Sequence, residues 1–314
     1  MNIVLMEGLG VDKAFLDEQA AKLEKMGHTF TVYEKSTDIS VQKERGKDAD
    51  VIILANMPLK GEVIQACKKL KFIDVAFTGV DHIGMEEARS RDIAVSNASG
   101  YATQAVAELC ISFMIQLLRK VKQTEIRCRE GGTKEGLIGN LLRGKTVGIV
   151  GAGAIGSGVA SLCKAFGCHV IVSSRRKAVN TNIFDEQVTI EDLLKRSDIV
   201  SLHCPLTEDT KNLIGKKELT LMKKNAILIN TARGAVVNSA DLSEALRNGT
   251  IAGAASDVFE TEPPLDLEHP LLHCPNIIVT PHIAFASVES MKLRAEIVFD
   301  NLYSWLNGEQ KNKV

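Results

Sequence analysis

A glycine-rich turn between an apolar run and a helical run is the feature that most constrains this chain. Residues 146–156 read TVGIVGAGAIG, and a helical pattern follows directly. In a strand–turn–helix unit, the first glycine of GxGxxG permits a tight turn, the second lets a pyrophosphate approach the backbone, and the third lets the helix pack on the strand. The helix N-terminus adds free N–H groups and a positive dipole end. We therefore predict a dinucleotide-binding unit whose pyrophosphate contacts are Gly151, Gly153, Ala154, Ile155 and Gly156.

Strand-like and helix-like runs alternate along the rest of the chain. The first hundred residues give strand patterns at 2–6, 29–33, 50–54 and 72–76, and helix patterns at 13–25, 62–68 and 85–90. After residue 145, apolar strand patterns recur at 146–150, 169–173, 199–202, 226–230, 252–256 and 277–280. This alternation is typical of parallel sheets covered on both faces, and 314 residues exceed an ordinary single core. We expect an α/β protein with two Rossmann-like, doubly wound parallel-sheet domains and a cleft between them.

Two further helical runs flank this second series of strands. The run 102–120 is apolar on most sides, so we expect it to be buried between domains or against a second subunit. The run 287–306 is amphipathic and has no strand pattern after it. It is expected to pack on a domain that is already built.

Charge and cysteine content narrow the class of protein. The formal net charge is -1, which gives no reason to expect nucleic acid or an anionic membrane surface as a partner. The chain begins without a basic, apolar leader, and it has no long uninterrupted apolar segment. Its 7 cysteines are scattered without a CxxC pair, as reduced thiols would be, and no metal-ligand spacing stands out. We expect a cytoplasmic protein with a small ligand and no metal.

The residues after 169–173 bear on the choice of cofactor. A carboxylate at the end of this strand normally binds the adenosine ribose hydroxyls and selects NAD. Here Ser174 takes that place, followed by the cations Arg175, Arg176 and Lys177. A hydroxyl and guanidinium groups suit a 2′-phosphate, so NADP(H) is favoured and NAD(H) remains possible. The alternative is that the basic run is an ordinary solvated turn.

Three polar residues follow strand patterns of the second series. Arg233 lies in NTARG, Glu262 in DVFETEP and His282 in TPHI. Ligands gather at the carboxyl ends of strands in open parallel sheets. Reduction of a 2-keto acid builds negative charge on the carbonyl oxygen, so it needs a fixed cation and a proton donor. Taken singly, each residue could be a surface arginine, a turn acid or a loop histidine; together they predict a catalytic group of this kind.

The order of these motifs resembles the D-isomer-specific 2-hydroxyacid dehydrogenase family. The likeness runs through 198–284, with HCPLT at 203–207 and the three motifs above, and includes GVDH at 79–82 and AVAE at 105–108. The resemblance implies a substrate-binding domain of residues 1–98 plus 287–314 and a dinucleotide-binding domain of residues 99–286. It also implies a homodimer.

The same resemblance assigns roles to individual residues. It implies that Arg233 holds the substrate carboxylate and carbonyl, that His282 is the acid/base, and that Glu262 pairs with His282. Asp257 would meet the nicotinamide carboxamide, and backbone N–H groups near Thr78 and Gly79 would take the substrate carboxylate. The remaining expected contacts are Thr103, His203, Cys204, Pro205, Thr210, Thr231 and Ala232 for the cofactor, and Asn56 and Met57 for the substrate.

The loop 54–59 bears on the substrate. Phosphoglycerate dehydrogenases, which the chain otherwise resembles, use arginine in this loop to bind the substrate phosphate, whereas here the loop is neutral and only Lys60 follows. We therefore expect reduction of an unphosphorylated 2-keto acid such as glyoxylate or hydroxypyruvate, or of a bulkier apolar one if Met57, Phe77 and Phe285 line the pocket. D-3-phosphoglycerate dehydrogenase remains the alternative, and a dinucleotide-sensing binding protein is a further one.

Overall fold

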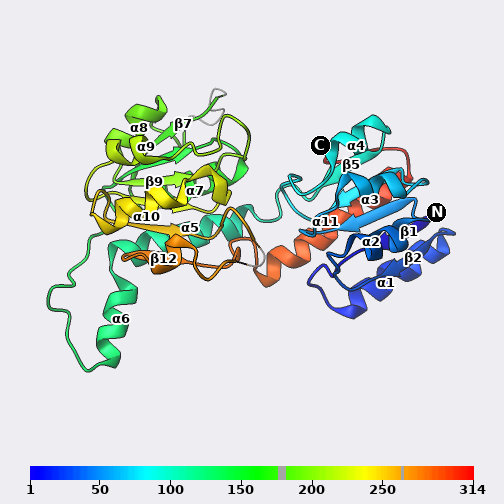
Figure 1. Cartoon of the computed structure of the whole chain (residues 1–314), viewed down its shortest axis with the longest axis horizontal. Coiled ribbons are helices and arrows are strands. Elements are labelled where there is room, and N and C mark those ends of the chain that lie inside the picture. Colours follow the sequence, from blue (N-terminus) through cyan, green and yellow to red (C-terminus); the bar gives the residue numbers. More distant parts are fainter. Residues whose placement is uncertain (176–181, 263–264) are drawn as a thin grey trace. The chain divides into compact units, whose positions relative to one another are not determined.

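The computed structural model describes residues 1–175, 182–262 and 265–314, and its backbone forms two compact units. The first comprises Met1–Ala102 with Phe285–Val314, and the second comprises Thr103–Ala284 (Figure 1). Each contains one parallel sheet with helices on its faces. The expected α/β class with two doubly wound parallel sheets is confirmed. Residues 99–102 and 285–286 belong to the first unit rather than the second, because Tyr101 and Phe285 pack around Phe77.

The first unit has a five-stranded sheet in the order β2-β1-β3-β4-β5. Its strands β3 and β4 are buried along their whole length, as expected for strands covered on both faces. The strands are β1 Asn2–Leu5, β2 Thr29–Val32, β3 Val51–Leu54, β4 Phe72–Val75 and β5 Ala94–Asn97; the helices are α1 Lys13–Lys25, α2 Ile39–Gly46, α3 Gly61–Ala66, α4 Met85–Ser90 and α11 Val288–Leu306.

The C-terminal helix α11 packs on β4 of this sheet. Trp305 stacks on Phe72 with ring centroids 4.8 Å apart, and Asn301 Nδ2 donates to Asp74 Oδ1 at 3.1 Å. The residues after α11 then return to the sheet, where the Val314 amide donates to the Val95 carbonyl at 3.0 Å. The helix predicted at 287–306 therefore forms and completes the first unit.

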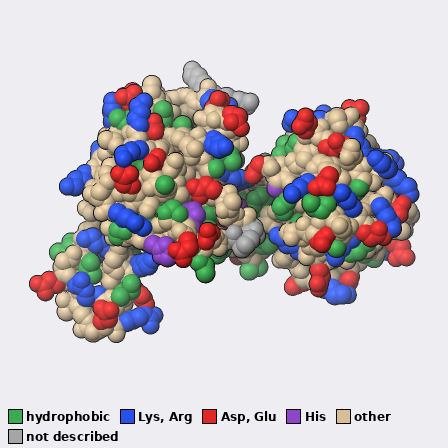
Figure 2. Space-filling view, viewed as in Figure 1, with side chains coloured by type: hydrophobic (Ala, Val, Ile, Leu, Met, Phe, Trp, Pro, Cys, Tyr) green, Lys and Arg blue, Asp and Glu red, His purple; other side chains and the backbone are tan. Residues whose placement is uncertain are grey.

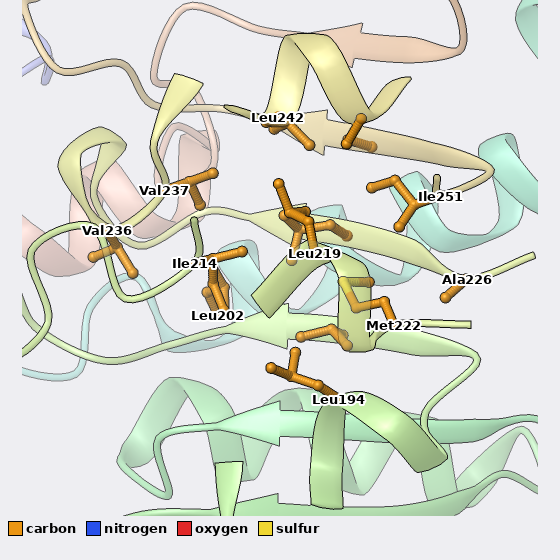
Figure 3. Close-up of a cluster of buried hydrophobic side chains, with 14 of the residues drawn as sticks. Leu194, Leu202, Ile214, Leu219, Met222, Ala226, Val236, Val237, Leu242 and Ile251 are labelled. Carbon is orange, nitrogen blue, oxygen red and sulfur yellow. The ribbon is translucent and has the colours of Figure 1, made fainter. Parts of the chain in front are cut away.

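The second unit has a seven-stranded sheet in the order β12-β11-β10-β9-β6-β7-β8. Its core is a cluster of aliphatic side chains from the strands and from the helices that cover them (Figure 3). The strands are β6 Thr146–Val150, β7 His169–Ser173, β8 Glu186–Gln187, β9 Ile199–Leu202, β10 Ile227–Asn230, β11 Gly253–Ser256 and β12 Ile277–Val279; the helices are α5 Thr103–Leu118, α6 Val121–Arg129, α7 Ala154–Ala165, α8 Ile190–Arg196, α9 Lys216–Leu221 and α10 Ser239–Arg247, with short 3-10 turns η1 Gly234–Val236 and η2 Pro270–His273.

Helix α5 is the apolar helix predicted at 102–120. It packs against α7 and β10 of its own unit, which accounts for the burial of Cys110, Phe113 and Met114. Helix α6, which follows it, buries none of its residues and stands out from the rest of the unit (Figure 1). In the described part of the chain, no helix has the length and hydrophobicity needed to cross a membrane.

Candidate active site and cofactor site

A cavity of about 870 Å³ opens in the second unit. It lies beside the loops that follow β6 and β9, which are neighbours in the sheet although the chain runs from β6 to β7. Ligands bind at such a reversal of strand order in open α/β sheets. The cavity is lined by Val150, Gly151, Ala152, Gly153, Ser173, Ser174, Arg175, Ile190, His203, Cys204, Pro205, Asp209, Thr210 and Leu213.

The glycines of GxGxxG shape one wall of this cavity. Gly151 has φ +105°, and a Cβ there would lie 2.7 Å from the His203 carbonyl oxygen. A Cβ on Gly156 would lie 2.0 Å from the Gly151 carbonyl oxygen, so only glycine lets α7 begin this close to β6. The N-terminus of α7, including Ala154 and Ile155, follows directly. A wall of backbone N–H groups and no bulky side chains fits the pyrophosphate of a dinucleotide.

The end of β7 brings the predicted ribose-binding residues to the cavity. Ser174 and Arg175 line it, and Gln187 Nε2 of β8 donates to the Ser174 carbonyl oxygen at 3.2 Å. Arg175 Nη1 lies 4.0 Å from Asp209 Oδ2, which comes from the loop after β9. Arg176, the other expected contact, lies outside the described residues. Asp209 was not among the predicted residues, because its loop gives no sign in the sequence of facing Arg175.

His203, Cys204 and Pro205, which follow β9, also line the cavity, beside the turn at Gly151. The His203 ring nitrogen Nε2 is 2.8 Å from Ser201 Oγ, and desolvation lowers the pKa of His203 to about 4. It is therefore neutral near pH 7 and suits packing and hydrogen bonding rather than proton transfer. Thr210 Oγ1 accepts from the Thr207 amide at 2.7 Å and donates to the Pro205 carbonyl oxygen at 2.6 Å, which fixes the loop.

The remaining expected cofactor contacts lie away from this cavity but within the same unit. Thr103 begins α5 beside Gly158 of α7, since a Cβ on that glycine would lie 3.4 Å from Thr103 Cγ2. Thr231 Oγ1 lies 3.2 Å from Cys110 Sγ of α5, and Ala232 packs on the aliphatic core.

The turn after β10 carries Arg233. The buried Asn230 side chain shapes it, accepting from the Ala232 amide at 3.1 Å and donating to the Arg233 carbonyl oxygen at 3.0 Å. A Cβ on Gly234 would lie 2.0 Å from the carbonyl carbon of Phe259, so the turns after β10 and β11 are in backbone contact. This contact brings the arginine turn to the segment that leads to Glu262.

His282 and Glu262, which the family resemblance pairs, lie side by side in the structure. His282 Nδ1 lies 2.7 Å from Glu262 Oε1, and the two side chains are 25% and 20% exposed. His282 has φ +55°, and its amide donates to the Asp257 carbonyl oxygen at 2.8 Å. Because the carboxylate engages Nδ1, the ring is oriented with Nε2 pointing away from Glu262. A partly open imidazole fixed in this way can exchange a proton with a ligand.

Asp257 holds the histidine loop. Its carboxylate is fully buried and accepts hydrogen bonds from the Thr280 hydroxyl, from the Ile283 amide at 2.8 Å and from the Ala284 amide at 2.7 Å. Burial raises the pKa of Asp257, and these donors oppose that rise. Asp257 thus connects the end of β11 to the loop that follows β12. The expected contact with the nicotinamide carboxamide stays a prediction.

The expected substrate residues of the first unit lie at the carboxyl ends of β3 and β4. Glu7 Oε1 accepts from the amides of Ala55 at 2.8 Å and Met57 at 2.6 Å, and Lys35 Nζ donates to Asn56 Oδ1 at 2.8 Å. Met57 itself is fully buried. The contact between Glu7 and this loop could not be predicted from the sequence, since the two segments are far apart in the chain.

The neighbouring turn after β4 carries Thr78 and Gly79. The Thr78 carbonyl oxygen accepts from Asn97 Nδ2 at 2.7 Å. Close by, Phe77 and Phe285 meet edge to face with ring centroids 5.1 Å apart. In the described residues, no group of three or more His, Cys, Asp or Glu side chains is placed to hold a metal ion.

The chain is similar to known proteins in both sequence and fold. Residues 111–284 match the model for the D-isomer specific 2-hydroxyacid dehydrogenase, NAD binding domain. A glyoxylate reductase of Thermococcus litoralis is 41% identical over 86% of this chain and 84% of that protein. A D-3-phosphoglycerate dehydrogenase of Methanocaldococcus jannaschii is 36% identical over 95% of this chain, but over 57% of its own length. The crystal structure of a glyoxylate reductase from Paecilomyes thermophila superposes with a TM-score of 0.89 at 30% identity, covering 100% of this chain and 98% of that one.

The fold and the dinucleotide loop define an NAD(P)-dependent oxidoreductase. The family match covers more than half of the chain and the relatives exceed 30% identity over most of it, so the chain belongs to the D-isomer specific 2-hydroxyacid dehydrogenase family. It is an NAD(P)-dependent 2-hydroxyacid dehydrogenase, that is, a 2-keto acid reductase.

Proposed function

We propose that this enzyme reduces a small 2-keto acid, such as glyoxylate or hydroxypyruvate, to the D-2-hydroxy acid, with NADP(H) as the favoured cofactor. The observation that carries the proposal is the His282–Glu262 pair, with 2.7 Å between Nδ1 and Oε1. It lies at the same edge of the sheet as Arg233 and the glycine-rich loop, because all of them follow the carboxyl ends of parallel strands. A proton donor, a cation and a dinucleotide cavity are the parts this reaction needs.

Each residue has a distinct role in this proposal. Bound NAD(P)H supplies the hydride. Arg233 binds the substrate carboxylate through paired N–H groups and offers positive charge to the carbonyl oxygen. His282 gives its proton to that oxygen from Nε2, and Glu262 keeps the ring oriented while it does so. Amides near Thr78 and Gly79 add hydrogen bonds to the substrate carboxylate.

The choice of NADP(H) rests on the end of β7. Ser174 and Arg175 line the cavity where an NAD-selecting carboxylate would otherwise follow this strand. A guanidinium can bind a phosphate through two parallel hydrogen bonds. NAD(H) remains the second cofactor to test.

Initial rates of the purified protein test the reaction and the cofactor together. NADPH and NADH would each be measured with glyoxylate, hydroxypyruvate, a branched-chain 2-keto acid and an aryl pyruvate. We expect rapid oxidation of NADPH with one of the two small acids. If every one of these acids leaves both cofactors unoxidised, the proposed reaction is wrong.

D-3-phosphoglycerate dehydrogenase is the second candidate, because one of the relatives bears that name and because a cation does reach the substrate loop. Lys35 Nζ is hydrogen-bonded to Asn56 Oδ1 and lies 3.4 Å from Glu7 Oε2. Glu7 offsets much of its charge, which favours an unphosphorylated substrate. A kcat/KM for 3-phosphohydroxypyruvate above that for hydroxypyruvate would reverse this ranking.

A homodimer is also part of the proposal. Within the second unit, α6 and residues 130–141 form an arm that begins after Leu118 and ends where the Asn140 amide donates to the Leu118 carbonyl at 2.8 Å. It exposes Ile126, Ile138 and Leu141, at 47%, 78% and 68%, and apolar side chains are visible on its surface (Figure 2). A second copy of the chain would cover them. Light scattering should give a dimer, and Ile138→Asp with Leu141→Asp should give a monomer; a wild-type monomer contradicts this assignment.

A further inference from the structure

Arg175 and Asp209 bring opposite charges to the mouth of one cavity. Arg175 follows β7, Asp209 lies in the loop after β9, and both line the space beside the glycine-rich loop. Their closest charged atoms, Nη1 and Oδ2, are 4.0 Å apart, and the side chains are 71% and 81% exposed. An ion pair this exposed adds little to stability. Its placement at a ligand cavity is therefore the property to explain.

Asp209 is the one carboxylate among the described residues that line this cavity. In related dinucleotide sites a carboxylate usually stands at the end of the strand that corresponds to β7, but here that position is Ser174. The Ser174 carbonyl oxygen accepts from Gln187. The negative charge at this cavity is therefore that of Asp209, in the loop after β9. It faces Arg175, the cation that we expect to bind a 2′-phosphate. NAD(H) and NADP(H) would therefore both enter a cavity that carries one positive and one negative side chain.

We propose that Asp209 competes with the 2′-phosphate of NADP(H) for Arg175 and so determines how strongly the enzyme discriminates between NADP(H) and NAD(H). The inference rests on the proposed function in one respect, that the cavity takes the adenosine half of the cofactor. With NAD(H), the Arg175–Asp209 pair stays intact, and the carboxylate remains an acceptor for ribose hydroxyls. With NADP(H), Arg175 must leave Asp209 to bind the phosphate, and Asp209 then stands near a group of like charge.

The consequence is a preference for NADP(H) weaker than Ser174 and Arg175 alone would give. Removing the charge of Asp209 frees Arg175 and removes the repulsion. Both effects favour the phosphorylated cofactor and do nothing for the other. Residue 209 therefore acts on the ratio of the two affinities and leaves the chemical step alone.

The test is direct binding to the purified full-length protein, with the dissociation constants of NADPH and NADH measured by fluorescence. In Asp209→Asn, the ratio of the NADH constant to the NADPH constant should rise about fivefold to tenfold, and tenfold corresponds to ~1.4 kcal/mol. Glu208→Gln is the matched control, because it removes the same charge from an exposed neighbour that does not line the cavity. Its ratio should stay within about twofold of the wild-type ratio.

A double-mutant cycle separates competition for Arg175 from simple repulsion. In an Arg175→Ala background, Asp209→Asn should no longer change the ratio by more than about twofold. An undiminished effect in that background would overturn competition as the cause. An unchanged ratio in the single Asp209→Asn variant would overturn the inference as a whole.

The binding data also separate this inference from the proposed function. Adenosine 2′,5′-bisphosphate and ADP, used as probes that cannot react, should repeat the shift seen with the two cofactors. A wild-type enzyme that binds NADH more tightly than NADPH would overturn the proposed cofactor preference, while a shifted ratio in Asp209→Asn would still support the role of Asp209. Failure of the wild-type protein to bind any of the four nucleotides would overturn both.

Discussion

Replacing Asp257 by Asn tests whether this buried carboxylate holds the histidine loop in place. Its Oδ1 accepts from the Thr280 hydroxyl and the Ile283 amide, and its Oδ2 accepts from the Ala284 amide. The side-chain oxygen of asparagine can accept the hydrogen bonds made to one of the two carboxylate oxygens. Its NH₂ group then takes the place of the other oxygen and faces a backbone N–H donor. The variant loses a charge-assisted hydrogen bond and leaves a buried donor unpaired, which together cost about 2–4 kcal/mol in the free energy of unfolding.

The loss should appear in both stability and catalysis. We expect the melting temperature to fall by roughly 5–10 °C and kcat to fall about 10–100-fold, since small displacements of a catalytic group cost about that much. Thr280→Val removes one neutral donor and should cost about 0.5–1.5 kcal/mol. Asp266→Asn, the same change at an exposed carboxylate, is the control. Thermal unfolding and steady-state rates measure these effects, and an Asp257→Asn enzyme that matches the control in both would refute the reasoning.

Three other variants test separate parts of the structure. His282→Ala should lower kcat by about 10²–10⁴-fold while NADPH still binds; unchanged turnover would remove His282 from the mechanism. Glu7→Gln keeps an acceptor for the amides of the 55–57 loop but removes the charge that offsets Lys35. The kcat/KM for 3-phosphohydroxypyruvate relative to that for hydroxypyruvate should therefore rise about fivefold, which corresponds to about 1 kcal/mol, whereas Glu24→Gln should leave this ratio unchanged. Asp74 is fully buried, and burial raises its pKa well above the usual range. The folded state is therefore not penalised by this group below the unfolded pKa of about 3.9, and its stability falls as pH rises from there through the folded pKa. Asp74→Asn should raise the melting temperature more at pH 8 than at pH 4, and equal shifts at both would contradict this.

The strands, and the edge of the sheet at which the candidate site lies, could be predicted from the sequence. Both depend on patterns within a single stretch of chain. Buried parallel strands need continuous apolar runs, and the residue after such a run necessarily lies at the carboxyl edge of the sheet. For this reason the sequence alone predicts that Arg233, Glu262 and His282 lie at one edge of the sheet. The bounds of the strands differ from the predicted ones by about one residue; β10, for example, begins at Ile227 rather than at 226.

The elements that were missed are short or polar. Helix α2 contains the charged residues 43–45 and depends on the Asp38 carboxylate, which accepts from the Ser40 amide at 2.7 Å. Strand β5 is four residues long and includes Ser96 and Asn97. Such segments are stable because of tertiary partners, and local patterning gives little sign of them.

Contacts between loops were beyond the sequence for a different reason. Glu7 meets the 55–57 loop, and Asp209 meets Arg175, only because β1 lies beside β3 and β9 lies near β7 in the folded sheets. Residue spacing along the chain carries no information about which side chains face each other across a sheet edge. Both contacts are therefore visible only in the folded structure.

Asp257 shows how a role taken from a resemblance and a role seen in the structure can coexist. An ionised carboxylate has about four acceptor positions, and the described donors occupy two on Oδ1 and one on Oδ2. One position on Oδ2 has no donor among the described residues, but the side chain is fully buried, so the predicted contact with the nicotinamide carboxamide requires the surrounding loop to shift. If that contact forms, one side chain fixes both the histidine loop and the cofactor ring. Asp257→Asn should then weaken NADPH binding as well as lower kcat, whereas an unchanged NADPH dissociation constant would leave the histidine loop as its only role.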